Sequence, residues 1–238
     1  MGKRFVLIHG AWHGGWCWDR AAESLRTRGH VVDAPTMPGH GPTDDRSRIS
    51  FQDYVNKIAE VLRSRPEPAV LVGHSSAGFM IQAAAPLVPD KIERLVFNNA
   101  FILPDQTSQF DLVPPEVARG MTAAAAASPD NCVPVDEAFV RDMLMAGDPE
   151  DDRKALLARL APQPLALFTT KIDAKPFQAL KIPQVVIFCR DDASLPPGAY
   201  LGMAQGLGEF DLIEIAGGHE TLFVNPDFFV ETLLQAAG

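Results

Sequence analysis

One ten-residue stretch, Ala69–Gly78, constrains the fold more than any other part of the chain. Four apolar residues run into a Gly-His-Ser-Ser-Ala turn at 73–77, and the residues that follow are typical of a helix start. A turn this tight forces its central residue into a strained backbone conformation and needs small neighbours. The pattern therefore predicts that Ser75 stands exposed above a sheet edge, with the positive end of a helix behind it.

The order of elements around this stretch predicts a doubly wound α/β fold. Short apolar runs, typical of strands buried on both faces of a parallel sheet, occupy 4–10, 30–35, 69–74, 94–100, 184–189 and 210–215. Helical patterns separate them, with clear examples at 19–28 and 50–65. We expect one domain over residues 1–238, with a mostly parallel sheet of about six strands and a ligand site beyond their carboxyl ends.

The segment from about residue 103 to 179 interrupts this alternation. It contains prolines, an alanine run at 123–127 and two helical patterns, at 136–146 and 151–160, but no convincing strand. A connection of this length is unusual in a compact domain unless it covers a site. We expect residues 104–180 to form a helical cap, inserted before the last two strands.

Composition narrows the cellular setting and the partners. The formal net charge of −9 repels phosphate backbones and acidic membrane faces, so neither nucleic acid nor a membrane is an expected partner. The first apolar run, Phe5–Ile8, is too short for a signal peptide core or a membrane span. Three scattered cysteines do not suggest a disulfide framework. We expect a cytoplasmic protein with buried thiols, and a homodimer stays open as its oligomeric state.

A serine hydroxyl is a weak nucleophile at neutral pH, so it needs a base within hydrogen-bond reach and an acid that orients the base. Of the six histidines, His219 directly follows the last strand, in a loop with two glycines that give it freedom. His9 and His74 adjoin motif glycines and are interpreted as residues that brace turns. The loop after the preceding strand offers two neighbouring acids, Asp191 and Asp192, one of which is then a solvated charge or a helix cap.

Acyl transfer also needs hydrogen-bond donors for the negative oxygen that develops in the transition state. One candidate is the backbone N–H of Ser76, directly after the nucleophile. The other is that of Ala11, where Gly10 lets the loop after the first strand approach closely. Trp12 and Phe79 adjoin this loop and the nucleophile, and they are the candidate substrate contacts.

The turn around Ser75 resembles the nucleophile elbow of the α/β-hydrolases, although the usual fifth residue is glycine and this chain has Ala77. Hydrolases of this fold are also similar in carrying Asp-X-X-X-Pro after a late strand, which matches Asp192 and Pro196 and favours Asp192 as the acid. The resulting order of serine, acid and histidine, with His219 last, is the order associated with this fold.

Four segments, 9–16, 72–75, 189–196 and 217–219, together resemble the plant methylesterase and hydroxynitrile lyase family and its bacterial esterase relatives. Residues 162–165 are similar to the cap of that family. The resemblance implies an ester-hydrolysing site. Lyases of the family resemble one another in having lysine directly after the catalytic histidine, where this chain has Glu220, and a hydroxyl residue in place of Ala11. Both differences favour the esterase branch.

These observations predict a serine carboxylesterase that acts on small, largely apolar esters through an acyl-enzyme, with the small-molecule ester as its partner. Water completes the reaction, so no organic cofactor or metal is expected. His9 and His13 are four residues apart, but on a glycine-containing turn rather than on a helix. The alternatives on the same site are a lactonase, a cofactor-free oxygenase or lyase, and a small-molecule receptor.

Overall fold

A computed structural model describes residues 2–238, and its centre is a six-stranded sheet in the order β2-β1-β3-β4-β7-β8. All neighbouring strands in it are parallel. The strands are β1 (Arg4–Ile8), β2 (Val31–Asp33), β3 (Ala69–His74), β4 (Ile92–Asn98), β7 (Gln184–Cys189) and β8 (Asp211–Ile215). Each predicted strand overlaps an observed one, and the predicted doubly wound α/β fold is confirmed.

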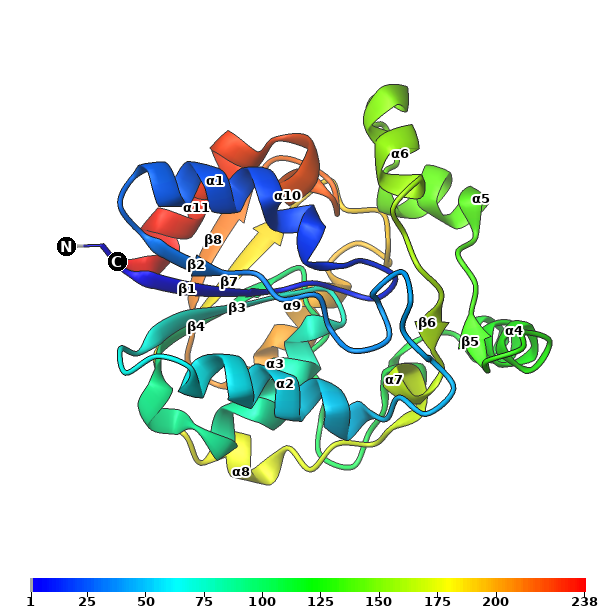
Figure 1. Ribbon diagram of the computed structural model, residues 1–238, viewed down its shortest axis with the longest axis horizontal. Coiled ribbons are helices and arrows are strands. Elements are labelled where there is room, and N and C mark those ends of the chain that lie inside the picture. Colours follow the sequence, from blue (N-terminus) through cyan, green and yellow to red (C-terminus); the bar gives the residue numbers. More distant parts are fainter. Residues whose placement is uncertain (1) are drawn as a thin grey trace.

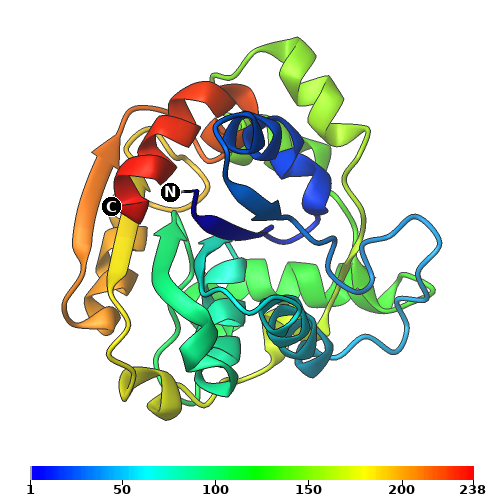
Figure 2. The ribbon, with the colours of Figure 1, turned by 60° about the vertical axis from the view of Figure 1, so that its left-hand side comes forward.

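Helices cover both faces of the sheet (Figures 1 and 2). On one face, α1 (Asp19–Thr27) packs beside α11 (Pro226–Ala237). On the other, α2 (Phe51–Arg63), α3 (Ala77–Ala84) and α9 (Ala199–Ala204) share a second core. The strands β2 and β3 lie on opposite sides of β1. The sheet therefore changes its direction of growth at β1, which is where open α/β sheets bind ligands.

Local signals set the ends of α2 close to the predicted 50–65. The backbone N–H of Ser50 donates to the Asp53 carboxylate at 2.8 Å, half of a capping box. The helix ends at Arg63, three residues before Pro66. The remaining short helices are α8 (Lys175–Gln178), α10 (Thr221–Val224) and 3₁₀ turns at Gly15–Trp18, Ala85–Leu87, Pro89–Lys91, Gln109–Leu112 and Gln205–Leu207.

The connection between β4 and β7 forms the cap, beyond one end of the sheet (Figure 1). It contains α4 (Pro115–Ala126), α5 (Glu137–Phe139), α6 (Glu150–Leu157), α7 (Ala166–Thr169) and the strands β5 (Cys132–Val133) and β6 (Gln163–Pro164). The last two pair antiparallel, so the expectation of a cap without strands was wrong. Strands of two residues are too short to give an alternating pattern. A π-helical turn, Val140–Leu144, also interrupts the helix expected at 136–146.

Two further sequence-based expectations concern the whole chain. Cys17, Cys132 and Cys189 are free and buried, which confirms the predicted buried thiols. Burial raises the pKa of the Cys189 thiol to about 12, so it stays protonated at neutral pH. Within residues 2–238, no helix combines the length and the apolar character that crossing a membrane requires.

Candidate active site

β3 passes into α3 through a turn centred on Ser75. This residue has a φ of 55°, a left-handed conformation that costs a non-glycine residue about 1–2 kcal/mol. Its carbonyl oxygen accepts hydrogen bonds from the N–H groups of Gly78 and Phe101, both at 3.0 Å, and its own N–H donates to the Asn98 carbonyl at 3.2 Å. These main-chain bonds hold the strained serine at the carboxyl end of β3.

Small residues behind the turn allow the strand and the helix to approach. A Cβ added to Gly73 would lie 3.0 Å from the Ala77 carbonyl oxygen. A Cβ on Gly78 would overlap the carbonyl oxygen of Phe101. The sequence pattern indicated small residues at 73 and 77, and the structure adds 78, because α3 lies directly against the loop that follows β4.

Asp192 and His219 lie on neighbouring loops, after β7 and β8. His219 Nδ1 donates to Asp192 Oδ2 at 2.6 Å, and each side chain is 2% exposed. Because Nδ1 holds this proton, Nε2 keeps its lone pair, which is the tautomer that a general base needs. Asp191, the other candidate acid, is exposed and accepts the Gly217 N–H at 2.8 Å instead. The geometry therefore pairs the histidine with Asp192.

The Asp192 carboxylate is held by two groups that sequence reasoning missed. Asn99 Nδ2 donates to Oδ2, and the Ser194 N–H donates to Oδ1 at 2.8 Å. The amide oxygen of Asn99 accepts the Cys189 N–H at 2.8 Å, which ties the ends of β4 and β7 together. The available signal was the pair of asparagines, Asn98 and Asn99, at the end of an otherwise apolar strand.

Burial and this pairing explain the electrostatics of the site. Burial alone would raise the pKa of Asp192, but the charge and hydrogen bond of His219, together with Ser194, lower it well below its ordinary value. Burial alone would lower the pKa of His219, but the charge and hydrogen bond of Asp192 raise it above its ordinary 6.5. Asp192 is therefore ionised at neutral pH and stabilises the imidazolium that forms when His219 accepts a proton.

The His219 imidazole lies beside the Ser75 turn. Its ring centroid is 4.6 Å from that of His74, whose Nε2 donates to the His219 carbonyl at 3.1 Å, so His74 links the Ser75 turn to the loop of His219. The Tyr200 ring stacks on the imidazole at 6.0 Å. Burial raises the pKa of the Tyr200 phenol, and hydrogen bonding to Ser194 and Ser75 opposes that rise.

The side-chain hydrogen bonds of His219 go to Asp192 and to Ser194 Oγ, the latter at 3.1 Å. Among residues 2–238, none joins its ring directly to the Ser75 hydroxyl. Hydrogen bonds between a nucleophile and its base are often long without substrate and tighten in the Michaelis complex. The structure brings the serine, the acid and the histidine to one sheet edge, with the last two in contact.

The two predicted oxyanion donors lie on loops that meet at Ser75. A Cβ added to Gly10 would lie only 2.8 Å from the Ser75 Cβ, so this approach requires glycine. Ala11 and Ser76 are both buried, and within the described chain their backbone N–H groups donate to no other protein atom. Two unused donors beside a nucleophile are suited to stabilising a negative oxygen.

The two predicted substrate contacts lie in different settings. Trp12 lies in the loop after β1 and contacts the cap, with its ring 5.8 Å from Phe139 and 5.4 Å from Phe168. Phe79 is fully buried and stacks on Phe51 of α2 at 5.6 Å, which is a core contact. The structure thus adds no support for a substrate role of Phe79. Since α3 is apolar on nearly every side, its sequence could not indicate which face meets a ligand.

The cap is joined to the loop after β1 through Gln163 of β6. Its side-chain oxygen accepts the Trp12 N–H at 3.1 Å, and its side-chain nitrogen donates to the Tyr54 hydroxyl at 2.9 Å. The Ala161 N–H also donates to the Trp12 carbonyl at 2.8 Å. A fully buried glutamine with both ends bonded thus holds β6 against the loop after β1 and against α2.

Metal binding here would compete with proton transfer. Donor atoms of His74, His219 and Glu220 lie within 4.8 Å of one another. However, His74 Nε2 and His219 Nδ1 are already hydrogen-bonded, so a metal would have to take His219 Nε2, the atom left to act as a base. The arrangement is better suited to acid–base chemistry.

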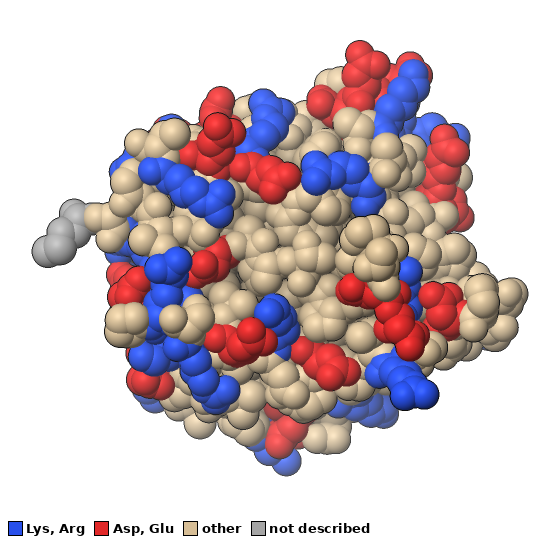
Figure 3. Space-filling view, in the orientation of Figure 1, with Lys and Arg blue, Asp and Glu red and all other residues tan. Residues whose placement is uncertain are grey.

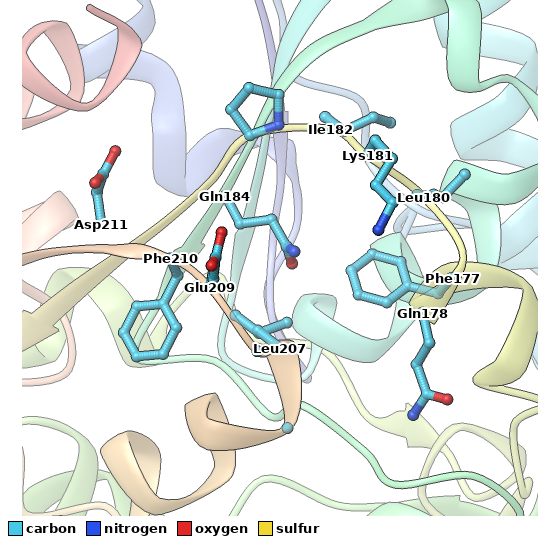
Figure 4. Close-up of a pocket in the computed structure, with 13 residues that line it drawn as sticks. Phe177, Gln178, Leu180, Lys181, Ile182, Gln184, Leu207, Glu209, Phe210 and Asp211 are labelled. Atoms are coloured by element: carbon cyan, nitrogen blue, oxygen red, sulfur yellow. The ribbon is translucent and has the colours of Figure 1, made fainter.

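The pocket shown in Figure 4 belongs to another part of the molecule. It is lined by residues that include Phe177 and Lys181, together with Gln184 and Asp211. β7 and β8 begin at Gln184 and Asp211, so this pocket opens at the amino ends of the strands. Ser75 follows the carboxyl end of β3, at the opposite edge of the sheet.

Comparisons with known proteins agree with this fold. The family model described as the alpha/beta hydrolase family matches residues 5–232. The chain belongs to this family. It is similar to an extracellular α/β-hydrolase from a Paenibacillus species, with 29% identity, a TM-score of 0.93 and 98% of each chain covered.

Two similar proteins have names that describe an activity. One is a pyrethroid hydrolase of Sphingobium wenxiniae, 27% identical over 98% of this chain and 86% of that protein. The other is methylesterase 18 of Arabidopsis thaliana, 28% identical over 98% of this chain and 96% of that protein. The chain is accordingly an enzyme of the carboxylesterase class.

Proposed function

We propose that this protein is a serine carboxylesterase for small, largely apolar esters. The observation that most supports the proposal is the 2.6 Å hydrogen bond from His219 to Asp192, beside the strained Ser75. This hydrogen bond leaves the His219 Nε2 with a free lone pair, next to the turn that carries Ser75. The unused N–H groups of Ala11 and Ser76 add the donors that acyl transfer requires.

In the proposed reaction, the Ser75 hydroxyl attacks the ester carbonyl while His219 Nε2 takes its proton. Asp192 stabilises the resulting imidazolium, and Ala11 and Ser76 donate to the oxyanion. The imidazolium then returns the proton to the departing alcohol, which leaves an acyl group on Ser75. Water, activated by the same imidazole, releases the acid and restores the serine.

The proposed preference for apolar esters rests on the surroundings of the loop after β1, which carries Ala11 and Trp12. Trp12 contacts the aromatic rings of Phe139 and Phe168, and Phe110 stacks on Phe168 at 5.4 Å. An aromatic wall of this kind favours apolar acyl or alcohol groups. On the outer surface, acidic and basic side chains are intermingled on the face shown in Figure 3.

A series of p-nitrophenyl esters from acetate to dodecanoate tests this function. We expect kcat/KM to be highest for the short members and at least about tenfold lower for dodecanoate, because the cap should limit the space available to a long acyl chain. A chelator should leave the rate unchanged. Binding of esters without turnover would instead favour a receptor, and loss of activity with the chelator that zinc restores would favour a metal enzyme.

The pH profile of kcat/KM tests the base. Since Asp192 raises the pKa of His219 above 6.5, activity should fall in acid with a midpoint above 6.5, where the imidazole becomes protonated and can no longer accept the serine proton. The measurement covers pH 5–9 at constant ionic strength. A midpoint below 6.5 on the acid side would show that the pKa of the His219 imidazole is not raised as its pairing with Asp192 requires.

A further inference from the structure

Glu220 is a fully buried carboxylate that the proposed reaction does not use. It directly follows His219, and its Oε1 lies 3.3 Å from His13 Nε2, with both side chains almost completely buried. Within residues 2–238, His13 Nε2 and both carboxylate oxygens of Glu220 have no hydrogen-bond partner, so the 3.3 Å contact between the two side chains is their closest polar interaction. An isolated buried charge is strongly unfavourable, so this contact must supply what each group lacks.

The other side of the His13 ring determines where the proton lies. His13 Nδ1 is 2.7 Å from the carbonyl oxygen of Ala11. A carbonyl can only accept, so Nδ1 carries a hydrogen and donates it. If Nε2 carried none, its lone pair would face the Glu220 carboxylate without water between them, which is unfavourable. One proton therefore lies between Glu220 and His13 and joins them across the 3.3 Å contact as a buried pair.

This pair connects two loops of the proposed site. Glu220 belongs to the loop of His219, and His13 donates to the residue whose N–H faces the oxyanion, Ala11. A second link, from His74 Nε2 to the His219 carbonyl, connects the histidine loop to the serine turn. The loops that carry the proposed base, nucleophile and oxyanion donor are thus linked to one another behind the reacting atoms.

We propose that Glu220 and His13 are positioning residues that fix the Ala11 N–H relative to the His219 imidazole. Proton transfer and oxyanion stabilisation then act on the same carbonyl group. This inference rests on the proposed esterase function. It adds to that function the reason why a carboxylate is buried directly after the base, in a place where it touches no substrate.

The surrounding charges agree with an ionised Glu220. Burial alone would raise its pKa, but the charge and hydrogen bond of His13, with smaller effects of His74 and His219, lower it to about 2. Asp148 of the cap shows the opposite behaviour, because burial, and then the charge of Glu220, raise its pKa. Glu220 is therefore ionised at neutral pH, and its charge acts on the neighbouring groups.

Two substitutions separate the hydrogen bond from the charge. Glutamine in Glu220→Gln can donate its amide N–H to His13 Nε2, so we expect kcat within about threefold of wild type. Leucine in Glu220→Leu has a similar size but cannot form the bond, so kcat should fall at least about tenfold while KM stays within about threefold, as for a displaced oxyanion donor. Glu209→Leu, at an exposed position, is the matched control and should leave both constants unchanged.

A transition-state analogue distinguishes positioning from a simple loss of folded protein. An alkylboronic acid that forms a tetrahedral adduct should bind Glu220→Leu more weakly by the same factor as the loss in kcat/KM. All rates are expressed per active site, counted by titration with a fluorophosphonate. If Glu220→Leu has the same kcat per titrated site and the same boronate affinity as wild type, the pair is merely structural and the proposal is wrong. Equal losses in Glu220→Gln and Glu220→Leu would also contradict it, because the charge rather than the bond would then matter.

Proton NMR of the imidazoles tests the pair without any ester. The shared proton should give a downfield resonance in wild type and in Ser75→Ala, and the resonance should be lost in Glu220→Leu. If wild type hydrolyses no ester but this resonance behaves as expected, the proposed function fails and the link between the loops stands. If Glu220→Leu leaves the histidine resonances unchanged, the link itself is refuted.

Discussion

Ser75→Ala is expected to lower kcat/KM for p-nitrophenyl butyrate by about 10⁵–10⁶-fold, because removal of an activated serine in such a site eliminates the acyl-enzyme route. The measurement is the initial rate at saturating and limiting ester, corrected for spontaneous hydrolysis. The turn should keep its geometry, since the hydrogen bonds that hold residue 75 come from its main chain.

Ser76→Ala is the matched control for this substitution. The Ser76 hydroxyl donates to Gln109 Oε1 at 2.9 Å, while the group proposed to meet the oxyanion is its backbone N–H, which alanine retains. We expect a loss of no more than about fivefold, that of one neutral hydrogen bond. Comparable activity in Ser75→Ala and Ser76→Ala would mean that another residue is the nucleophile.

Asp192→Asn is expected to lower kcat by about 10³–10⁴-fold with little effect on KM. The carboxylate of Asp192 accepts the Nδ1 proton of His219 at 2.6 Å, and an amide can instead donate to Nδ1 and move the ring proton to Nε2. The base then has no lone pair toward the serine. Rates should be compared with thermal unfolding curves, because Asn99 and Ser194 also bind this carboxylate.

Asp191→Asn provides the comparison at the adjacent position. Asp191 is exposed and accepts the Gly217 N–H, a role that the amide oxygen of asparagine can fill. Its activity should stay within about threefold of wild type, as for most surface substitutions. A larger loss from Asp191→Asn than from Asp192→Asn would transfer the role of the acid to Asp191.

The sheet and the serine turn could be predicted because their signals are local. Strands buried on both faces, such as 69–74 and 184–189, form unbroken apolar runs, and the glycines around Ser75 report a close approach of strand and helix. The choice of Asp192 over Asp191 as the acid needed the resemblance to hydrolases, because nothing else in the sequence distinguishes two adjacent aspartates. The hydrogen bonds of the structure separate them by orientation.

The strands of the cap and the residues that support the site could not be predicted from local sequence signals. β5 and β6 have two residues each, and their pairing depends on contacts between distant segments. Asn99 binds Asp192 on another loop, so only the adjacent pair of asparagines could have marked it. Ser194 and Tyr200 follow Asp192 within a few residues, but no motif distinguishes them from ordinary loop and helix residues. In the sequence, Glu220 was informative only because lyases of the similar family have a lysine at this position. Its contact with His13, more than 200 residues away in the chain, is visible only in the structure.

The most direct test of the account is the identity of the residue that becomes covalently modified. Wild-type protein treated with a fluorophosphonate should gain one adduct, located on Ser75 by peptide mass spectrometry, and lose ester hydrolysis in the same proportion. His219→Ala should react far more slowly at the same position. Full inactivation with the adduct on another residue, or ester hydrolysis that continues after Ser75 is completely modified, would contradict the account.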